Sequence, residues 1–224
     1  QGMGSGQSGM AQAAVYGSSH SGPAYVSGAL AYAWHDVTTS RVVTLAGSDK
    51  LDANFDANVL SSRLEGGYRL PAFGGLPASF GVTPYAAVQA QGMFLPAYAE
   101  TAAPGSSQQL ALSYAASDDY TVRTELGAWF DADLPSSLAA LKFYSRAAWA
   151  HDFNNESTAS AFFQQLPGSS FLINTAKPAP NSALVTAGFE YRLADGWSVL
   201  AKFDGDFAAT TASYAGSAVL RKVW

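Results

Sequence analysis

Hydrophobic and polar residues alternate with a period of two along most of this chain, which is the pattern of β-strands. The stretch LKFYSRAAWAHDF (141–153) places Phe143 and Trp149 in one set and Lys142 and Arg146 in the other. The same alternation, with β-branched and aromatic residues, predicts an all-β chain. Nine strands are expected, at residues 9–17, 24–36, 55–70, 80–92, 119–131, 138–153, 183–193, 197–207 and 213–224.

The connections between the expected strands alternate in length, with the last one (208–212) as the exception. Consecutive connections of an up-and-down antiparallel sheet lie at opposite ends, so the short turns gather at one end and the long loops at the other. Outer-membrane β-barrels have this asymmetry, with short periplasmic turns and long extracellular loops. The short connections are 18–23, 71–79, 132–137 and 194–196, and the long ones are 37–54, 93–118 and 154–182.

Charged residues within the strands lie on the face opposite to the aliphatic and aromatic residues. Acidic and basic side chains are balanced there, and several stand two residues apart, as Arg63 and Glu65 do. Such a face fits the polar lumen of a membrane barrel, where opposite charges on adjacent strands pair. The residues predicted to line the lumen are Arg63, Glu65, Arg123, Glu125, Lys142, Arg146, Glu190, Arg192, Lys202 and Asp204.

The apolar face is predicted to meet lipid, with aromatic residues concentrated near the strand ends. Trp34 and Trp149 lie near the long-loop ends, and Trp197 and Trp224 near the short-turn ends, which predicts two interfacial girdles. A soluble β-sandwich or lipocalin-like barrel is the alternative, but charged residues are only 13% of the chain, about half the usual share. The residues predicted to face lipid are Trp34, Phe143, Trp149, Phe189, Trp197, Phe203 and Trp224.

The sequence offers little for enzyme chemistry. The chain has no Cys, and its scattered Lys and Arg residues do not form a nucleic-acid-binding patch. His35 and His151 are each followed by Asp, but no further residue stands at metal-ligand spacing. No apolar run approaches the ~20 residues of a membrane helix, and the N-terminal residues do not form a signal peptide. We therefore predict no catalytic, metal or cofactor-binding residue, and an exported chain would need an upstream part.

In order and spacing, several of these segments resemble the C-terminal β-domain of autotransporters, the type V secretion family of Gram-negative bacteria. The segments are AYVSGALAYAWHDVTTSR (24–41), SSRLEGGYRL (61–70), VTPYAAVQAQ (82–91), VRTELGAW (122–129), RAAWAHDF (146–153), LPGSSFLIN (166–174), LVTAGFEYRLADGWSVLAKFDGDF (184–207) and SYAGSAVLRKVW (213–224). The resemblance implies an antiparallel up-and-down transmembrane β-barrel of twelve strands, of which about nine are present. Residues 1–224 are then expected to be the C-terminal portion of the barrel, with two unpaired edges.

The resemblance also implies a function. The expected role is a translocator and anchor in the bacterial outer membrane that supports secretion of an N-terminal passenger. Its partners would be membrane lipid, the outer-membrane barrel-assembly machinery and the chain's own passenger segment, which is absent here. Trp224 matches the terminal aromatic of the family's assembly signal, whereas Lys222 departs from the apolar residue that the family favours there. The alternatives are a stand-alone outer-membrane barrel acting as adhesin or pore, and an outer-membrane enzyme with a site on the long loops.

Overall fold

The computed structural model describes residues 4–45, 47–71, 79–135, 140–154, 158–166, 168–174 and 179–223. Antiparallel strands make up most of this part of the chain, and a single 3-10 turn, η1 (Ala194–Gly196), joins two of them. Within the described ranges, no helix has the length and hydropathy to cross a membrane.

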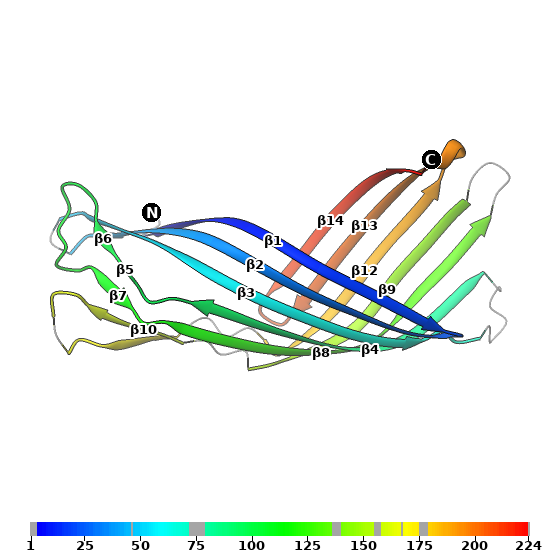
Figure 1. Ribbon diagram of the computed structural model, residues 1–224, viewed down its shortest axis with the longest axis horizontal. Coiled ribbons are helices and arrows are strands. Elements are labelled where there is room, and N and C mark those ends of the chain that lie inside the picture. Colours follow the sequence, from blue (N-terminus) through cyan, green and yellow to red (C-terminus); the bar gives the residue numbers. More distant parts are fainter. Residues whose placement is uncertain are drawn as a thin grey trace.

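Nine strands of the main sheet follow one another in sequence order, as the alternation predicted. Each strand pairs antiparallel with its neighbours in this order, and the first and last strands have one neighbour each, so that main-sheet strands that follow one another along the chain lie side by side in the sheet (Figure 1). The strands are β1 (Gly4–Ser21), β2 (Ala24–Val43), β3 (Asp49–Tyr68), β4 (Phe80–Leu95), β8 (Ser117–Pro135), β9 (Ala140–Phe153), β12 (Asn181–Arg192), β13 (Trp197–Ala208) and β14 (Ala212–Lys222).

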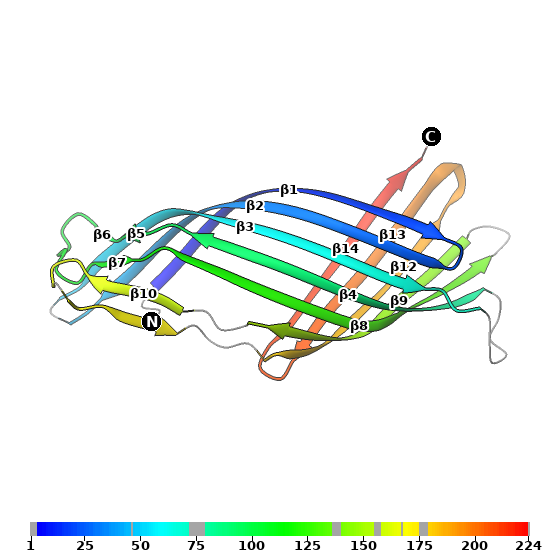
Figure 2. The ribbon, with the colours of Figure 1, turned by 60° about the horizontal axis from the view of Figure 1, so that its bottom comes forward.

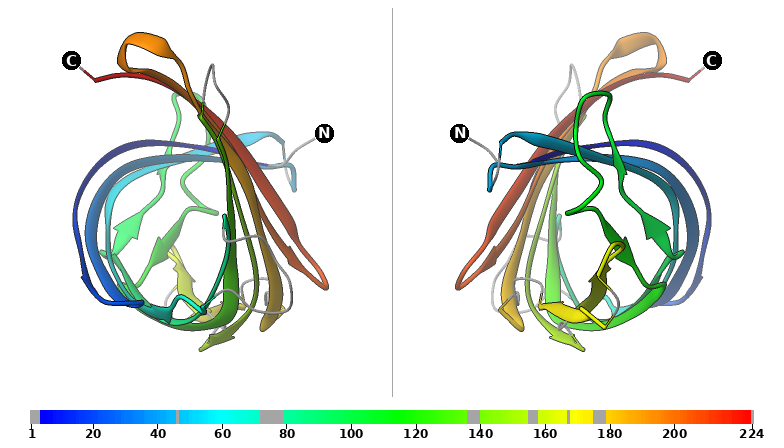
Figure 3. Two further views of the ribbon diagram at one scale, coloured as in Figure 1. Left: turned by 90° about the vertical axis from the view of Figure 1, so that its right-hand side faces the viewer. Right: turned by 90° about the vertical axis from the view of Figure 1, so that its left-hand side faces the viewer.

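The main sheet curls into a trough, whose strands run obliquely along its length (Figure 2). Its first and last strands, β1 and β14, form opposite rims of the trough (Figure 3). In the part of the chain that the structure describes, β1 pairs only with β2, and β14 pairs only with β13. The sheet is therefore open, and every residue of β1 is exposed.

The connection expected at 37–54 is mostly strand rather than loop. β2 and β3 continue as a paired hairpin from Val37 opposite Phe55 to Val43 opposite Asp49. The β-branched residues of this stretch favour extended backbone. Several of its polar residues, such as Thr38 and Asn54, lie on the outward-facing side of the hairpin.

The expectation of a single sheet is wrong at the long-loop end. Four short strands from the connections 93–118 and 154–182 form a second sheet, and a fifth, β6 (Thr101–Ala102), pairs with β3. Strands of two to six residues are too short to show a readable alternation. The four strands, in sheet order, are β11 (Phe171–Asn174), β10 (Thr158–Phe163), β7 (Leu112–Tyr114) and β5 (Tyr98–Ala99).

The second sheet and its connections, which we call the loop-end cap (residues 96–116 and 158–174, where described), cover the inner face of β2 and β3. The Phe55 ring of β3 stacks on Tyr98 of the cap, with ring centroids 3.9 Å apart. Leu51, four residues before Phe55 on the same face of β3, is 1% exposed. Ala111 and Ala161 of the cap are fully buried. Much of the apolar core among the described residues therefore lies at the long-loop end of the molecule.

Candidate functional site

The most connected polar site centres on Glu125, a residue of β8 that is only 4% exposed. Its carboxylate accepts two hydrogen bonds from Arg63 of β3, at 2.7 and 2.8 Å, which reach across the intervening strand β4. Tyr85 of β4 donates a third hydrogen bond at 3.1 Å, and Arg146 of β9 forms an ion pair at 3.5 Å. Two guanidinium groups and a phenol thus hold this carboxylate as a buried anion.

Contacts from this centre continue in both directions around the sheet. On one side Arg63 also donates to Glu65, which accepts from the Tyr25 hydroxyl of β2 at 2.6 Å. On the other side Arg146 contacts Thr186 of β12 at 3.2 Å. Thr186 in turn donates to Asp204 of β13, which is paired with Lys202 at 2.7 Å. We call this chain of contacts, from Tyr25 to Lys202, the ionic belt.

A second cluster lies beside the ionic belt, one row nearer the long loops. Arg123 of β8 forms a bidentate pair with Asp152 of β9, with both distances at 2.7 Å. The same guanidinium donates to Asp206 of β13 at 2.8 Å, across the two intervening strands β9 and β12. Bidentate guanidinium–carboxylate pairs impose a fixed geometry. The cluster therefore ties together strands that are not neighbours in the sheet.

The ionic belt and the Arg123 cluster face one common cavity of about 330 Å³. Its lining comes from strands β3 through β14, which is possible only on the concave side of the trough. Basic and acidic groups both line it, four and three respectively. The lining includes Arg63, Arg123, Glu125, Arg146, Lys202, Asp204 and Asp206.

The other three sequence-predicted lumen residues lie outside both the ionic belt and the Arg123 cluster. Glu190 accepts a hydrogen bond from Arg192 at 3.0 Å, an exposed pair on β12. Lys142 of β9 lies directly opposite Glu190 in the strand register. These three residues form a smaller group on the side of the belt nearer the short turns.

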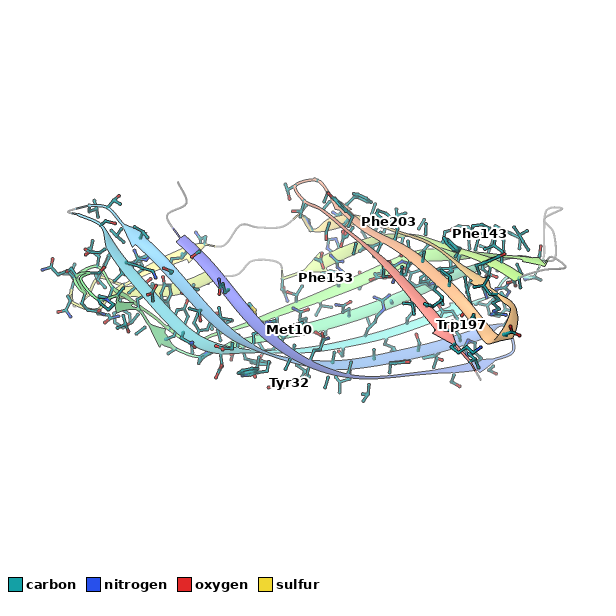
Figure 4. The ribbon with its side chains drawn as sticks, turned by 90° about the horizontal axis from the view of Figure 1, so that it is seen from above. Met10, Tyr32, Phe143, Phe153, Trp197 and Phe203 are labelled. Carbon is teal, nitrogen blue, oxygen red and sulfur yellow. The ribbon has the colours of Figure 1, made fainter. Side chains whose placement is uncertain are left out.

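Large apolar side chains cover the opposite, convex face of the main sheet. Phe143 is 44% exposed and Phe203 is 42% exposed, and Trp34, Trp149 and Trp197 are similarly exposed, while Phe189 is half-buried. Tyr32 lies at one outer flank of the trough, and Phe143 and Phe203 lie at the other (Figure 4). Trp224, expected in the girdle at the short-turn end, lies outside the described residues.

Several members of the network were missed from the sequence because they are uncharged. Tyr25, Tyr85 and Thr186 bridge the charged groups, and the Arg146 guanidinium lies 5.3 Å from the centre of the Trp129 ring. Each stands at an inward-facing position of its strand, so the alternation of the sequence already places it on the concave face. Which of the polar residues on that face meet depends on the register between strands.

A separate polar cluster lies inside the loop-end cap. Glu100, 4% exposed, pairs with Arg41 of β2 and accepts a hydrogen bond from the Leu112 N–H at 2.9 Å. Next to it, Tyr98 stacks on Tyr114 with ring centroids 4.5 Å apart. Burial raises the pKa of Tyr98 to about 12, from an ordinary value of 10.0. Since these groups satisfy one another, the cluster is a structural element of the cap.

The polar groups of the concave face are engaged with one another. Among the described residues, no group of three or more His, Asp or Glu side chains is placed to hold a metal ion. The acidic groups of the belt are engaged by cations or hydroxyl groups. A charge-balanced, hydrogen-bonded wall of this kind offers polar contacts without a concentrated charge of either sign.

An antiparallel sheet with a concave polar face, a convex apolar face and loops sorted by length defines the class of outer-membrane β-barrels. The family model Autotransporter beta-domain matches residues 1–204. The chain therefore belongs to the autotransporter β-domain family, as the sequence segments indicated. A search of curated proteins found no match.

Membership of this family establishes the setting of the protein. Autotransporter β-domains are outer-membrane β-barrels of Gram-negative bacteria, and they serve in general as translocators associated with a passenger domain. The family is one of translocators, not of known enzymes.

Proposed function

We propose that this domain supports the passage of an N-terminal passenger across the outer membrane, with the concave face as the lining of its lumen. In this role the lumen-predicted residues face a passing polypeptide, and the convex residues from Trp34 to Phe203 face lipid. The work is physical: the barrel provides a polar path through an apolar bilayer.

The observation that supports this proposal most directly is the ionic belt. It places paired charges on the concave face, while exposed Phe and Trp side chains cover the convex face at the same level. A folded protein surrounded by water would expose the charged face and bury the apolar one. A polypeptide crossing the lumen would meet hydrogen-bonding groups that are already paired, and so would not be held tightly.

Surface display of the passenger tests the proposal. An epitope tag placed in the passenger of the full-length gene should be detected on intact cells by antibody staining and removed by added protease. Removing residues 1–224 should leave the tag inside the cell envelope, whereas a tag displayed equally well without them would refute the proposal. A version with Glu190→Gln, outside the ionic belt, should display the tag normally and serves as the control.

We further propose that additional strands of the same polypeptide close the barrel between β1 and β14. Both rims are open in the described part of the chain. A bilayer offers no water to satisfy unpaired N–H and C=O groups, so an open edge is not stable there. Cysteines placed at Val15 of β1 and at an added upstream strand should form a disulfide if the two lie side by side.

We also propose that the outer-membrane barrel-assembly machinery recognises the C-terminal strand. Support comes from the open edge of β14, which leaves backbone groups free to pair, and from the terminal aromatic residue in the sequence. Trp224→Ala should lower the amount of folded barrel in the outer membrane. The measurement is the fraction of protein with heat-modifiable gel mobility, and an unchanged fraction would contradict the proposal.

A further inference from the structure

We propose that the convex wall binds a glycerophospholipid at a defined site, with one acyl chain in a phenylalanine-walled groove over β9, β12 and β13 and the phosphate beside Lys222. This goes beyond translocation, and it rests on the proposed lipid contact of the convex face. The two halves of the site, groove and headgroup contact, are separate features of the structure.

The floor of the groove is a line of small residues that crosses three strands. Ala187 of β12 lies directly opposite Ser145 of β9 and opposite Phe203 of β13. Ala201, two residues before Phe203 on β13, continues the line toward the short-turn end. The groove above these residues has a volume of about 570 Å³, which is within the range of small-molecule sites.

Phenylalanine rings form the sides of the groove. Phe203 borders one side, and Phe143 and Phe189 border the other, directly opposite each other and with ring centroids 6.5 Å apart. Phe130, opposite Ser145 in the register, closes the end nearest β8. Phe143 and Phe203 lie on the same outer flank as Trp197 (Figure 4). The groove is therefore open to the surroundings along its length but bounded on three sides.

These boundaries favour a bound chain over a passing one. Lipid tails are as apolar as the rings, so the hydrophobic effect gives no preference for the groove over the bulk bilayer. The gain comes from dispersion contacts, because a chain on the small-residue floor touches ring carbons on both sides. The rings are already placed by their strands, so little side-chain freedom remains to be lost.

Lys222 supplies the headgroup contact. It lies opposite Trp197 in the register, and its Nζ is 5.1 Å from the centre of the Trp197 ring. The ammonium donates one hydrogen bond to the Asp195 carbonyl oxygen, and an ammonium group has three donors, so others remain for a phosphate oxygen. This position is at the short-turn, periplasmic end of the strands, where Lys side chains extend to the membrane surface.

The separation of the two features matches one lipid molecule. Ala201, at the near end of the groove, is four residues along β13 from Trp197, or about 14 Å at the usual rise of ~3.4 Å per residue. An acyl chain that leaves a headgroup beside Lys222 therefore reaches Ala201 part-way along its length. The remainder of the chain fits the groove toward Ser145.

Native mass spectrometry of the full-length protein, purified from outer membranes in a mild detergent, tests the site. The probe is 1-palmitoyl-2-oleoyl phosphatidylglycerol, titrated onto delipidated protein. Ala187→Phe and Ala201→Phe each fill the floor of the groove without removing a polar group. Ala183→Phe is the matched control, on the same face of β12 but outside the lining. Lys222→Gln tests the headgroup contact, with the neighbouring Arg221→Gln as its control.

The parent protein and both controls should bind one lipid molecule with the same affinity. Each groove variant and Lys222→Gln should weaken binding by roughly tenfold or more. Equal binding by all the proteins, or no saturable binding by the parent, overturns the proposal. Heat-modifiable gel mobility confirms that each variant is folded. If one of the two groove variants does not fold, the lipid binding of the other one tests the groove.

Surface display of the passenger separates this site from the proposed function. Groove variants that lose lipid binding but still display the passenger show that the lipid site and translocation are distinct. If the parent binds lipid saturably but displays no passenger, translocation fails and the lipid site stands.

Discussion

Strands β2 and β3 place apolar side chains on the outer, convex face near the ionic belt and on the inner, concave face near the long loops. At the level of the ionic belt, the outward side of β2 carries Val26 and Leu30, and the concave side of the sheet carries charged and hydroxyl groups. Toward the long loops the outward side becomes polar, with Asp36 and Thr38, which are both exposed. There the inner side becomes apolar and packs against the loop-end cap.

This reversal shows that neither face of the sheet is intrinsically the inside. Alternation separates two sets of side chains, and the surroundings decide which set is covered. In the bilayer, lipid covers the apolar set and polar groups line the lumen. Toward the long loops, beyond Trp34, the chain supplies its own cover for the apolar inner side in the form of the loop-end cap. The two regions should therefore respond differently to equivalent changes.

The largest effect is expected from Glu125→Leu at the centre of the ionic belt. It leaves Arg63 and Arg146 without their shared carboxylate on a half-buried face. Breaking a buried ion pair by removing one partner costs about 3–5 kcal/mol. Reversible urea unfolding in lipid vesicles measures the free energy of unfolding of the full-length barrel.

Glu190→Gln is the control for this change. Its partner Arg192 is 61% exposed, so the guanidinium remains solvated and the loss of stability should be much smaller than that of Glu125→Leu. Equal losses for the two variants would mean that the belt is no more than a set of independent surface pairs.

A charge on the outward face should be costly at one level and harmless at the other. Phe143→Arg places a guanidinium in the apolar band and should lower the free energy of unfolding by ~2–4 kcal/mol. Thr38→Arg makes the same change beyond the girdle and should stay within about 0.5 kcal/mol of the parent. Both are measured by unfolding in vesicles. A harmless Phe143→Arg would refute the lipid contact of this face, and a costly Thr38→Arg would move the membrane boundary outward.

Glu100→Leu should damage the loop-end cap and leave the barrel intact. The change leaves the Leu112 N–H without its acceptor, and one buried unsatisfied donor costs roughly 1–3 kcal/mol. Arg41 is partly exposed and can turn to water. Limited proteolysis should cut the variant within 96–116 sooner than the parent, while heat-modifiable mobility stays the same. Loss of that mobility would show that cap and barrel fold as one unit.

The smallest effect is on ionisation in the cap. The Tyr98 phenol should ionise near pH 12 in the folded protein and near its ordinary pKa of 10.0 when unfolded. The unfolded form then loses its proton first as the pH rises, so the contribution of Tyr98 to cap stability is complete below pH 10 and is lost as the pH rises toward 12. The ultraviolet difference titration between parent and Tyr98→Phe isolates this phenol. A midpoint at the ordinary value would mean that the stack with Phe55 and Tyr114 is open in solution.

Much of the main sheet was predictable because its signal is local. Alternation over nine or more residues located all nine strands, and the sorted connections gave their order and the antiparallel pairing. The family was predictable because the spacing of whole segments survives where single motifs are unspecific. The cap strands were not predictable, because segments such as Tyr98–Ala99 are two residues long and pair only because β7 lies beside them.

The sequence alone determined which residues share a face of the sheet, because the side-chain period of a strand is two. One face carries Arg63, Glu65, Glu125 and Arg146, and the other carries Phe143, Phe189 and Phe203. Tertiary structure decided which of these residues meet. Arg63 reaches Glu125 across β4, and Arg123 reaches Asp206 across β9 and β12, because curvature brings together the inward side chains of strands that are not neighbours. The line of Ala201, Ala187 and Ser145 between Phe rings likewise exists only in the strand register, which depends on pairing between segments far apart in the chain.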